Sequence, residues 1–204
     1  MAVAAGVSPR RPAHGVRSAL AAALLLGLTP IFGKQAIQAG MSPQTVVALR
    51  TAAATVLLLA VLGFRRRHLA IYPVGLLGCV MAGVINGLGS LLYYAGLARL
   101  DAGLAQMLYG LYPVFVAALL YLDGLRHGRL ALLGLALSVP ATYLMTQTSL
   151  VEVDIAGVGM MLGAGLLYAV HIPINERVLY EVPAPTVTFY TLAAMTLVVV
   201  PVAL

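Results

Sequence analysis

The chain has 204 residues, of which 62% are hydrophobic and 9% charged, and its mean hydropathy is +1.01. A soluble domain carries about 25% charged residues, and a soluble fold of this length could not bury so many apolar side chains. The composition excludes an ordinary soluble enzyme and a disordered chain, and it predicts a chain that lies mostly in lipid. The net charge of +6 does not indicate a nucleic-acid partner, because the basic residues separate apolar runs instead of alternating with aromatic side chains.

Seven runs of about 20 apolar residues follow one another with short connections, and a helix of that length crosses a bilayer. We therefore expect an all-α, polytopic membrane protein with about seven transmembrane helices. The third run has an alternative end at Leu97. The predicted spans are Ser18–Gln38, Gln44–Phe64, Ala70–Leu92, Ala102–Leu122, Leu130–Gln147, Ile155–Asn175 and Thr186–Leu204.

Polar residues and prolines mark where these spans begin. Asp101 and Asp154 stand directly before the fourth and sixth spans, where a carboxylate can accept hydrogen bonds from the first free amides. Pro43 and Pro185 suit the first turn of the second and seventh spans. Pro30 lies inside the first span, where it removes a backbone hydrogen bond.

The basic residues predict an orientation, because Lys and Arg concentrate in the cytoplasmic connections of membrane proteins. Nine arginines lie in the N-terminal tail and alternate connections, whereas the opposite connections hold only Arg99. We expect a multi-pass protein of the cell (inner) membrane with a cytoplasmic N-terminus. The nine are Arg10, Arg11, Arg17, Arg65, Arg66, Arg67, Arg126, Arg129 and Arg177.

Two parts of the chain follow the same order of apolar helix, short connection with proline, and second apolar helix. The first part begins near Gly27 and the second near Gly165. Five predicted helices separate their starts, so the second part enters the membrane from the opposite side. This is the arrangement of an inverted repeat, which many secondary transporters have.

An ordered set of short motifs extends over nearly the whole chain from about Leu20. The motifs are Thr29–Lys34, Pro43 with Ala48–Arg50, Leu91–Leu97, Ala102–Ala105, Leu111–Phe115 and Leu167–Val170. With these motifs the sequence resembles the EamA-type branch of the drug/metabolite transporter superfamily.

The resemblance implies a ten-helix transporter built from two inverted five-helix repeats, with the substrate cavity between them. On that pattern, residues 1–17 form a basic cytoplasmic tail, 18–148 the first repeat and 155–204 the start of the second. The chain stops at Leu204 inside an apolar run, so we expect it to be truncated after the seventh helix. A homo-oligomer and a second chain that supplies the missing helices are both open alternatives.

Two cations inside predicted spans are candidates for substrate binding, because charge in the bilayer is costly. Lys34 lies about one turn from the outer end of the first span, and Arg50 lies about two turns, or ~10 Å, into the second. Together they could attract an anionic group, and the Arg50 fork suits a carboxylate. The alternatives are that Lys34 reaches the interface and that Arg50 binds helix-end carbonyls or Asp101.

Polar and aromatic stripes on the third and fourth spans supply the other candidates. Asn86 and Tyr94 share one face of the third span, and Gln106 and Tyr109 share a face of the fourth. These side chains could line a substrate path with hydrogen-bonding groups. The alternative is that they only bond neighbouring helices to one another.

Small residues and one histidine have structural explanations as well. Gly83 with Gly87, and Gly159 with Gly163, are spaced for close helix contact, either static or sliding. His171 could relay protons or serve as a hydrogen-bonded packing residue.

The sequence offers no catalytic constellation, no metal cluster around its one cysteine and no phosphate-binding loop, so we expect neither an enzyme nor a cofactor. The main hypothesis is a secondary transporter of small metabolites, such as amino-acid-like compounds or drugs. It would act by alternating access, with export as the direction that the resemblance suggests. Its expected partners are a small-molecule substrate and the lipid bilayer. The alternative is a non-transporting membrane scaffold, an assembly partner or an inactive truncated product.

Overall fold

The computed structural model describes residues 12–63, 70–122, 124, 136–137, 140, 144 and 154–204. This described part is helical and contains no strand. Nearly all of the predicted fifth span, Leu130–Gln147, lies outside the described residues. The helices are α1 (Pro12–Gln38), α2 (Pro43–Gly63), α3 (Pro73–Arg99), α4 (Ala102–Tyr109), α5 (Tyr112–Leu122), α7 (Ile155–Leu179) and α8 (Ala184–Ala203).

Six stretches of the described chain are long and apolar enough to cross a membrane. They correspond to the predicted first, second, third, fourth, sixth and seventh spans, so the all-α, polytopic prediction is confirmed. The third and sixth helices are longer than predicted, since α3 continues to Arg99 and α7 to Leu179, past Pro173. The chain is therefore a multi-pass membrane protein.

The predicted helix caps are present. Asp101 and Asp154 each accept a hydrogen bond from the backbone two residues later, at 2.9 and 2.8 Å, which satisfies amides that have no partner within the helix. Ser42 Oγ accepts one from the backbone three residues later at 3.1 Å. The last helix begins at Ala184, one residue before the proline expected to open it.

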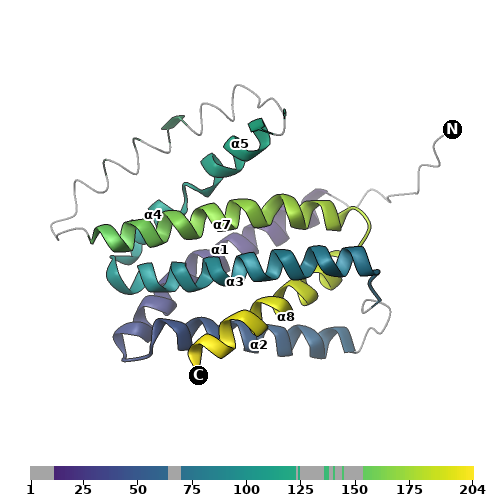
Figure 1. Ribbon diagram of the computed structural model, residues 1–204, viewed down its shortest axis with the longest axis horizontal. Helices are drawn as coiled ribbons and strands as arrows, with labels where there is room; N and C mark the ends of the chain where they lie inside the picture. Colours follow the sequence, from purple (N-terminus) through teal and green to yellow (C-terminus); the bar gives the residue numbers. More distant parts are fainter. Residues whose placement is uncertain are drawn as a thin grey trace.

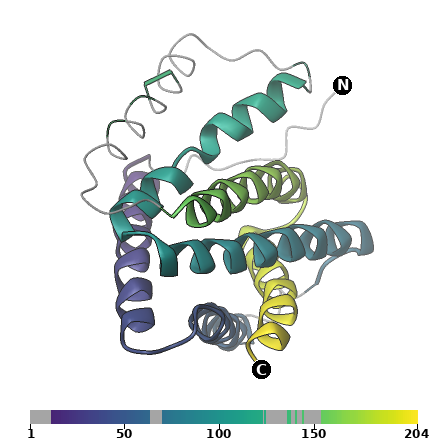
Figure 2. The same cartoon turned by 60° about the vertical axis from the view of Figure 1, so that its left-hand side comes forward.

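The fourth span is not one continuous helix, which corrects the prediction. The backbone leaves the α-helical pattern at Gly110 and Leu111, and the Leu111 amide bonds the Leu108 carbonyl at 3.2 Å in a tighter turn. Pro113 explains the break, because it has no amide hydrogen and its ring would collide with the Tyr109 carbonyl four residues back. As a result α5 diverges from the line of α4 (Figure 2).

α3 occupies the centre of the bundle. It runs antiparallel to α7 and is crossed by α8, which also packs on α2 (Figure 1). The α3–α7 contact is close at Gly96 and Gly157, where an added Cβ on Gly96 would lie 3.1 Å from the Gly157 carbonyl oxygen. Glycine thus allows the two backbones to approach, as at many helix contacts in membranes.

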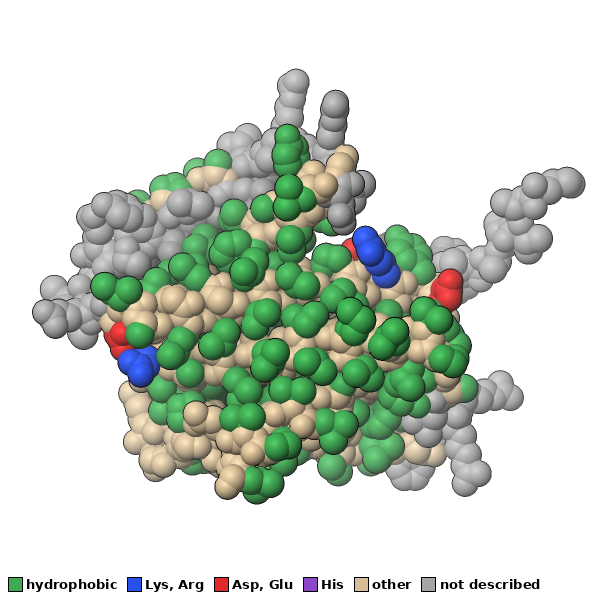
Figure 3. All heavy atoms as spheres, viewed as in Figure 1, with side chains coloured by type: hydrophobic (Ala, Val, Ile, Leu, Met, Phe, Trp, Pro, Cys, Tyr) green, Lys and Arg blue, Asp and Glu red, His purple; other side chains and the backbone are tan. Residues whose placement is uncertain are grey.

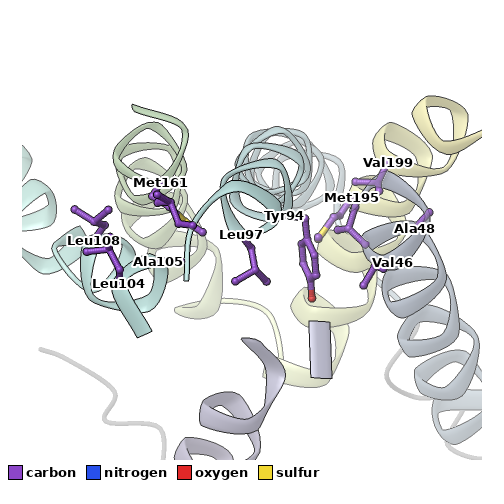
Figure 4. Close-up of a cluster of buried hydrophobic side chains, with 12 residues drawn as sticks. Val46, Ala48, Tyr94, Leu97, Leu104, Ala105, Leu108, Met161, Met195 and Val199 are labelled. Atoms are coloured by element: carbon purple, nitrogen blue, oxygen red, sulfur yellow. The ribbon is translucent and has the colours of Figure 1, made fainter. Parts of the chain in front are cut away.

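The main core cluster joins α2, α3, α4, α7 and α8 (Figure 4). Leu97 and Tyr94 lie at its middle, and Met161 and Val199 reach it from α7 and α8; each of these four is at most 1% exposed. α1 takes little part, because residues 16–28 are all exposed. α1 therefore forms an outer wall that touches the bundle mainly near its C-terminal end.

The outer surface is apolar over the middle of the visible face, and charged side chains lie at its two ends (Figure 3). At one end Arg99 Nη1 lies 2.9 Å from Asp154 Oδ2, an ion pair that joins the end of α3 to the start of α7. Exposed leucines such as Leu24, Leu57 and Leu197 are 68–77% exposed. Contact with lipid explains this surface, because exposure of so many large apolar side chains to water would be unfavourable.

Candidate functional site

A cavity of about 490 Å³ lies between α1, α2, α3, α4, α5 and α7. Its volume falls within the range of roughly 300–1,000 Å³ that is usual for small-molecule sites. Four of the six candidate residues line it: Arg50, Asn86, Gln106 and Tyr109. The remaining walls come from the α1 residues Ala23, Leu26, Gly27, Thr29 and Pro30, from Gly89, Ser90 and Tyr93 of α3, from Tyr112 of α5, and from Ala164 and Tyr168 of α7.

Arg50 supplies the positive charge of the cavity. Its guanidinium carbon lies 5.4 Å from the centre of the Tyr94 ring, which is within cation–π range. Among the described residues no carboxylate forms an ion pair with it. The alternative contact with Asp101 is not formed in the described structure, since Asp101 caps α4. The guanidinium therefore lies over the Tyr94 ring, and the Arg50 side chain is exposed and lines the cavity.

Tyr94 lies beneath Arg50 and does not line the cavity. It is 1% exposed and belongs to the central core. Gly33 of α1 lies against its ring, where an added Cβ would come within 2.9 Å of Cε1. The contacts of Tyr94 thus suit a platform for Arg50, and a direct role in substrate binding stays a prediction.

Lys34 also lies outside the cavity lining. Its Nζ donates hydrogen bonds to the carbonyl oxygens of Leu97 and Leu100, both at 2.7 Å, and of Ala98 at 3.3 Å. These carbonyls belong to the last turn of α3 and to its C-cap residue Leu100, where the helix dipole favours a cation. The geometry fits a clamp between α1 and α3, and the predicted role of Lys34 in substrate binding stays untested.

Three neutral polar side chains of the cavity, Asn86, Tyr93 and Gln106, come from α3 and α4. The Tyr93 hydroxyl donates to Gln106 Oε1 at 3.0 Å, so the two helices are bonded across the wall. Asn86 Nδ2 approaches the Met195 sulfur at 3.7 Å, and thioethers are weak acceptors. The Asn86 amide therefore keeps most of its hydrogen-bonding capacity for another partner.

Tyrosine rings make up an aromatic wall, defined here as Tyr93, Tyr109, Tyr112 and Tyr168. Tyr93 and Tyr109 meet edge to face with centres 4.9 Å apart, as do Tyr112 and Tyr168 at 5.0 Å. Tyr109 lies 5.6 Å from Tyr168 and so connects the two pairs. The break at Gly110 lets Tyr109 and Tyr112 approach the same ring of α7 from different helices.

His171 lies behind the aromatic wall. It is 8% exposed, and its ring stacks on Tyr168 with centres 5.7 Å apart. Nδ1 lies 2.9 Å from the Ala82 carbonyl oxygen, and Nε2 lies 2.9 Å from Asn175 Nδ2. A carbonyl only accepts and an amide nitrogen only donates, so these partners assign a neutral ring that carries its proton on Nδ1. The packing interpretation of His171 fits this geometry.

The charge of the site is one-sided among the described residues. The four described carboxylates, Asp101, Asp154, Glu176 and Glu181, lie near or beyond helix ends, and none lines the cavity. Within the described ranges no group of three metal-ligating side chains occurs. The site can thus bind and orient a small organic anion through Arg50 and the neutral polar groups.

The comparison with protein families supports the resemblance noted in the sequence. No curated protein and no solved structure gives a significant match. The model described as the EamA-like transporter family matches residues 14–147, which include α1 except its first two residues, α2 to α5, and every candidate residue. With more than half of its length matched and with membrane-spanning helices around a cavity, the chain belongs to the EamA-like transporter family.

Proposed function

We propose that this chain is a secondary transporter that exports small organic metabolites, such as amino-acid-like compounds or drugs, across the inner membrane. The single observation that carries the proposal is the 490 Å³ cavity, which is lined by membrane-spanning helices and contains an arginine without a described carboxylate partner. A charged side chain inside a bilayer is costly, so its presence favours a function. Arg50, Asn86, Gln106 and Tyr109 are the proposed substrate-binding residues.

The proposed mechanism is alternating access around this cavity. Residues 18–148 would form one five-helix repeat, and 155–204 would begin an inverted second repeat, so substrate would bind between the two. The position of Tyr168 supports this, because α7 belongs to the second unit and yet lines the cavity beside α3 and α4. The arginine distribution supports a cytoplasmic N-terminus.

A non-transporting scaffold is the second candidate, and the exposed α1 favours it. Only a small part of α1 is buried, so the helix offers an apolar face to lipid or to another chain. A homo-oligomer or a partner chain could cover that face. A scaffold would not need the cation that Arg50 contributes to the described cavity lining, and this makes transport the better-supported function.

Flux through sealed vesicles separates the two candidates. The purified chain is reconstituted into liposomes, and counterflow of labelled small organic acids and amino acids is measured. Arg50→Gln should lower the flux by about tenfold or more, the loss expected when a charge-assisted hydrogen bond disappears. Tyr121→Phe is the matched control, because Tyr121 is 71% exposed at the end of α5 and away from the cavity.

The expected result is saturable flux that Tyr121→Phe preserves and Arg50→Gln lowers by about tenfold or more. Absence of flux for every compound, with the protein folded and correctly inserted, would contradict the transporter proposal and favour the scaffold. Equal flux in the parent chain and in Arg50→Gln would show that the cavity is not the substrate path.

A further inference from the structure

We infer that the cavity selects monoanionic aromatic acids, that is, compounds with one carboxylate, a planar ring and no ammonium group. This inference rests on the proposed function and narrows its substrate class. It separates such acids from zwitterionic amino acids, which carry the same carboxylate and a second, positive group. Three features of the cavity support it: the cation of Arg50, a described lining without an anionic partner for an amine, and the aromatic wall.

The cation is positioned to accept a carboxylate. The Arg50 guanidinium carbon lies over the Tyr94 ring, 5.4 Å from its centre, and Tyr94 itself is immobilised by burial in the core. Arg50 is exposed and lines the cavity, so the edge of the planar guanidinium, which bears its N–H donors, is available to a ligand. That edge matches the two oxygens of a carboxylate. Because no described carboxylate occupies it, a substrate would supply the missing negative charge.

An ammonium group would find no such partner. The described lining contains no Asp or Glu, and its polar side chains are the neutral Thr29, Asn86, Ser90, Gln106 and tyrosines. The sequence has no acidic residue between Asp123 and Glu152 either, so the predicted fifth helix brings none. A substrate ammonium would lose water without an ion pair and would be repelled by Arg50 in the same cavity.

The aromatic wall defines the other end of the substrate. Tyr93, Tyr109, Tyr112 and Tyr168 come from four different helices; two pairs meet edge to face, and the Tyr109 and Tyr168 rings that connect them are tilted by 44°. Rings in this arrangement present edges and faces to a further ring, which gains from offset or edge-on contact. A planar body therefore suits this end better than a short aliphatic chain of equal charge.

Four matched probes test the inference by direct binding. They are 3-phenylpropanoate, phenylalanine, 2-phenylethylamine and propanoate, which differ only in the ring, the carboxylate and the amine. Binding to the purified chain in detergent is measured by titration calorimetry. We expect 3-phenylpropanoate to bind roughly tenfold or more tightly than phenylalanine or propanoate, and the amine not to bind.

Variants assign these preferences to residues. Arg50→Gln should weaken 3-phenylpropanoate binding by about tenfold or more. The affinity of Arg50→Lys should lie between those of the parent chain and Arg50→Gln, because lysine keeps the charge but cannot donate two parallel hydrogen bonds to a carboxylate. Tyr109→Leu should reduce the preference for 3-phenylpropanoate over propanoate. Arg99→Gln is the control, since Arg99 pairs with Asp154 at the end of α3 and should leave all four affinities unchanged.

Several outcomes would overturn the inference. They are phenylalanine binding as tightly as 3-phenylpropanoate, binding of the amine, binding of none of the four probes, and affinities that Arg50→Lys leaves unchanged. The failure of the proposed function has a different signature, because 3-phenylpropanoate would then bind without being moved in the vesicle assay. Transport with a preference for phenylalanine would support the proposed transport function and refute the inferred preference for aromatic acids without an ammonium group.

Discussion

Gly83 of α3 is the position where one added methyl group has the clearest predicted cost. A Cβ at this position would lie 2.5 Å from the Thr191 carbonyl oxygen and 2.6 Å from the Ala194 Cβ, both on α8. Ordinary contact begins at about 3.4 Å, so α8 would have to move by about 0.9 Å, the difference between 3.4 and 2.5 Å. Backbone cannot yield as a flexible side chain can.

The magnitude follows from the cost of overpacking, which is typically about 1–3 kcal/mol. Alanine also stabilises a helix by about 0.5–1 kcal/mol relative to glycine. This gain in stability partly offsets the loss caused by overpacking. Gly159→Ala isolates the gain, because a Cβ at Gly159 of α7 meets nothing within 4 Å. The difference between the two variants is therefore the cost of the α3–α8 contact, about 1–3 kcal/mol.

Reversible unfolding in mixed micelles, followed by far-ultraviolet circular dichroism, measures this difference. Gly83→Ala should lower the free energy of unfolding relative to Gly159→Ala, whereas Gly159→Ala should equal or exceed the parent chain. Equal stabilities of the two variants would refute the close approach of α3 and α8 at Gly83. That result would also argue against a close helix contact at the pair Gly83 and Gly87.

Three further predictions concern single contacts. Lys34→Met should lower the free energy of unfolding by about 2 kcal/mol, because the carbonyls at the end of α3 lose a charged donor. The affinity for 3-phenylpropanoate should stay constant. A changed affinity with unchanged stability would instead place Lys34 in the substrate site. His171→Leu should cost about 1–3 kcal/mol in the same unfolding assay, because the Ala82 carbonyl and Asn175 lose their partner, and an unchanged stability would contradict this network. The hydrogen bond from Arg99 lowers the pKa of Asp154 below its ordinary value of 3.8, so the pair stabilises the fold above that value and the contribution is lost as the pH falls through the folded pKa. Asp154→Asn should therefore reduce the acid dependence of stability, and an identical acid profile would argue against the pair.

The six spans that the structure describes were predicted well from the sequence, because each depends on local composition. Runs of apolar residues and capping carboxylates act within one helix, and Asp101 and Asp154 cap the helices where expected. The break before Pro113 was missed, although proline without an amide hydrogen was a signal for it. The apolar composition continues on both sides of Pro113, so the run of apolar residues does not indicate that the helix axis changes direction there.

The site could be predicted only in part, because helical periodicity shows which residues share a face of one helix but not which other helix packs against that face. Arg50, Asn86, Gln106 and Tyr109 were selected by polarity within apolar helices, and the structure brings these four to one cavity. Lys34 satisfied the same criterion, yet its long side chain reaches the end of α3. The contribution of Tyr168 depends on the contact between α3 and α7, which no local pattern encodes.

Access of water to the cavity from both sides of the membrane tests the central claim most directly. Ser90 lines the cavity and the one native cysteine, Cys79, is buried, so Ser90→Cys can be labelled in sealed vesicles with a charged, membrane-impermeant thiol reagent. Leu57→Cys is the control, since Leu57 is 68% exposed on the apolar outer surface and should stay unlabelled in lipid. Alternating access predicts labelling of Ser90→Cys from each side in turn and protection by a transported compound. Labelling from one side only, or from neither, would contradict the account.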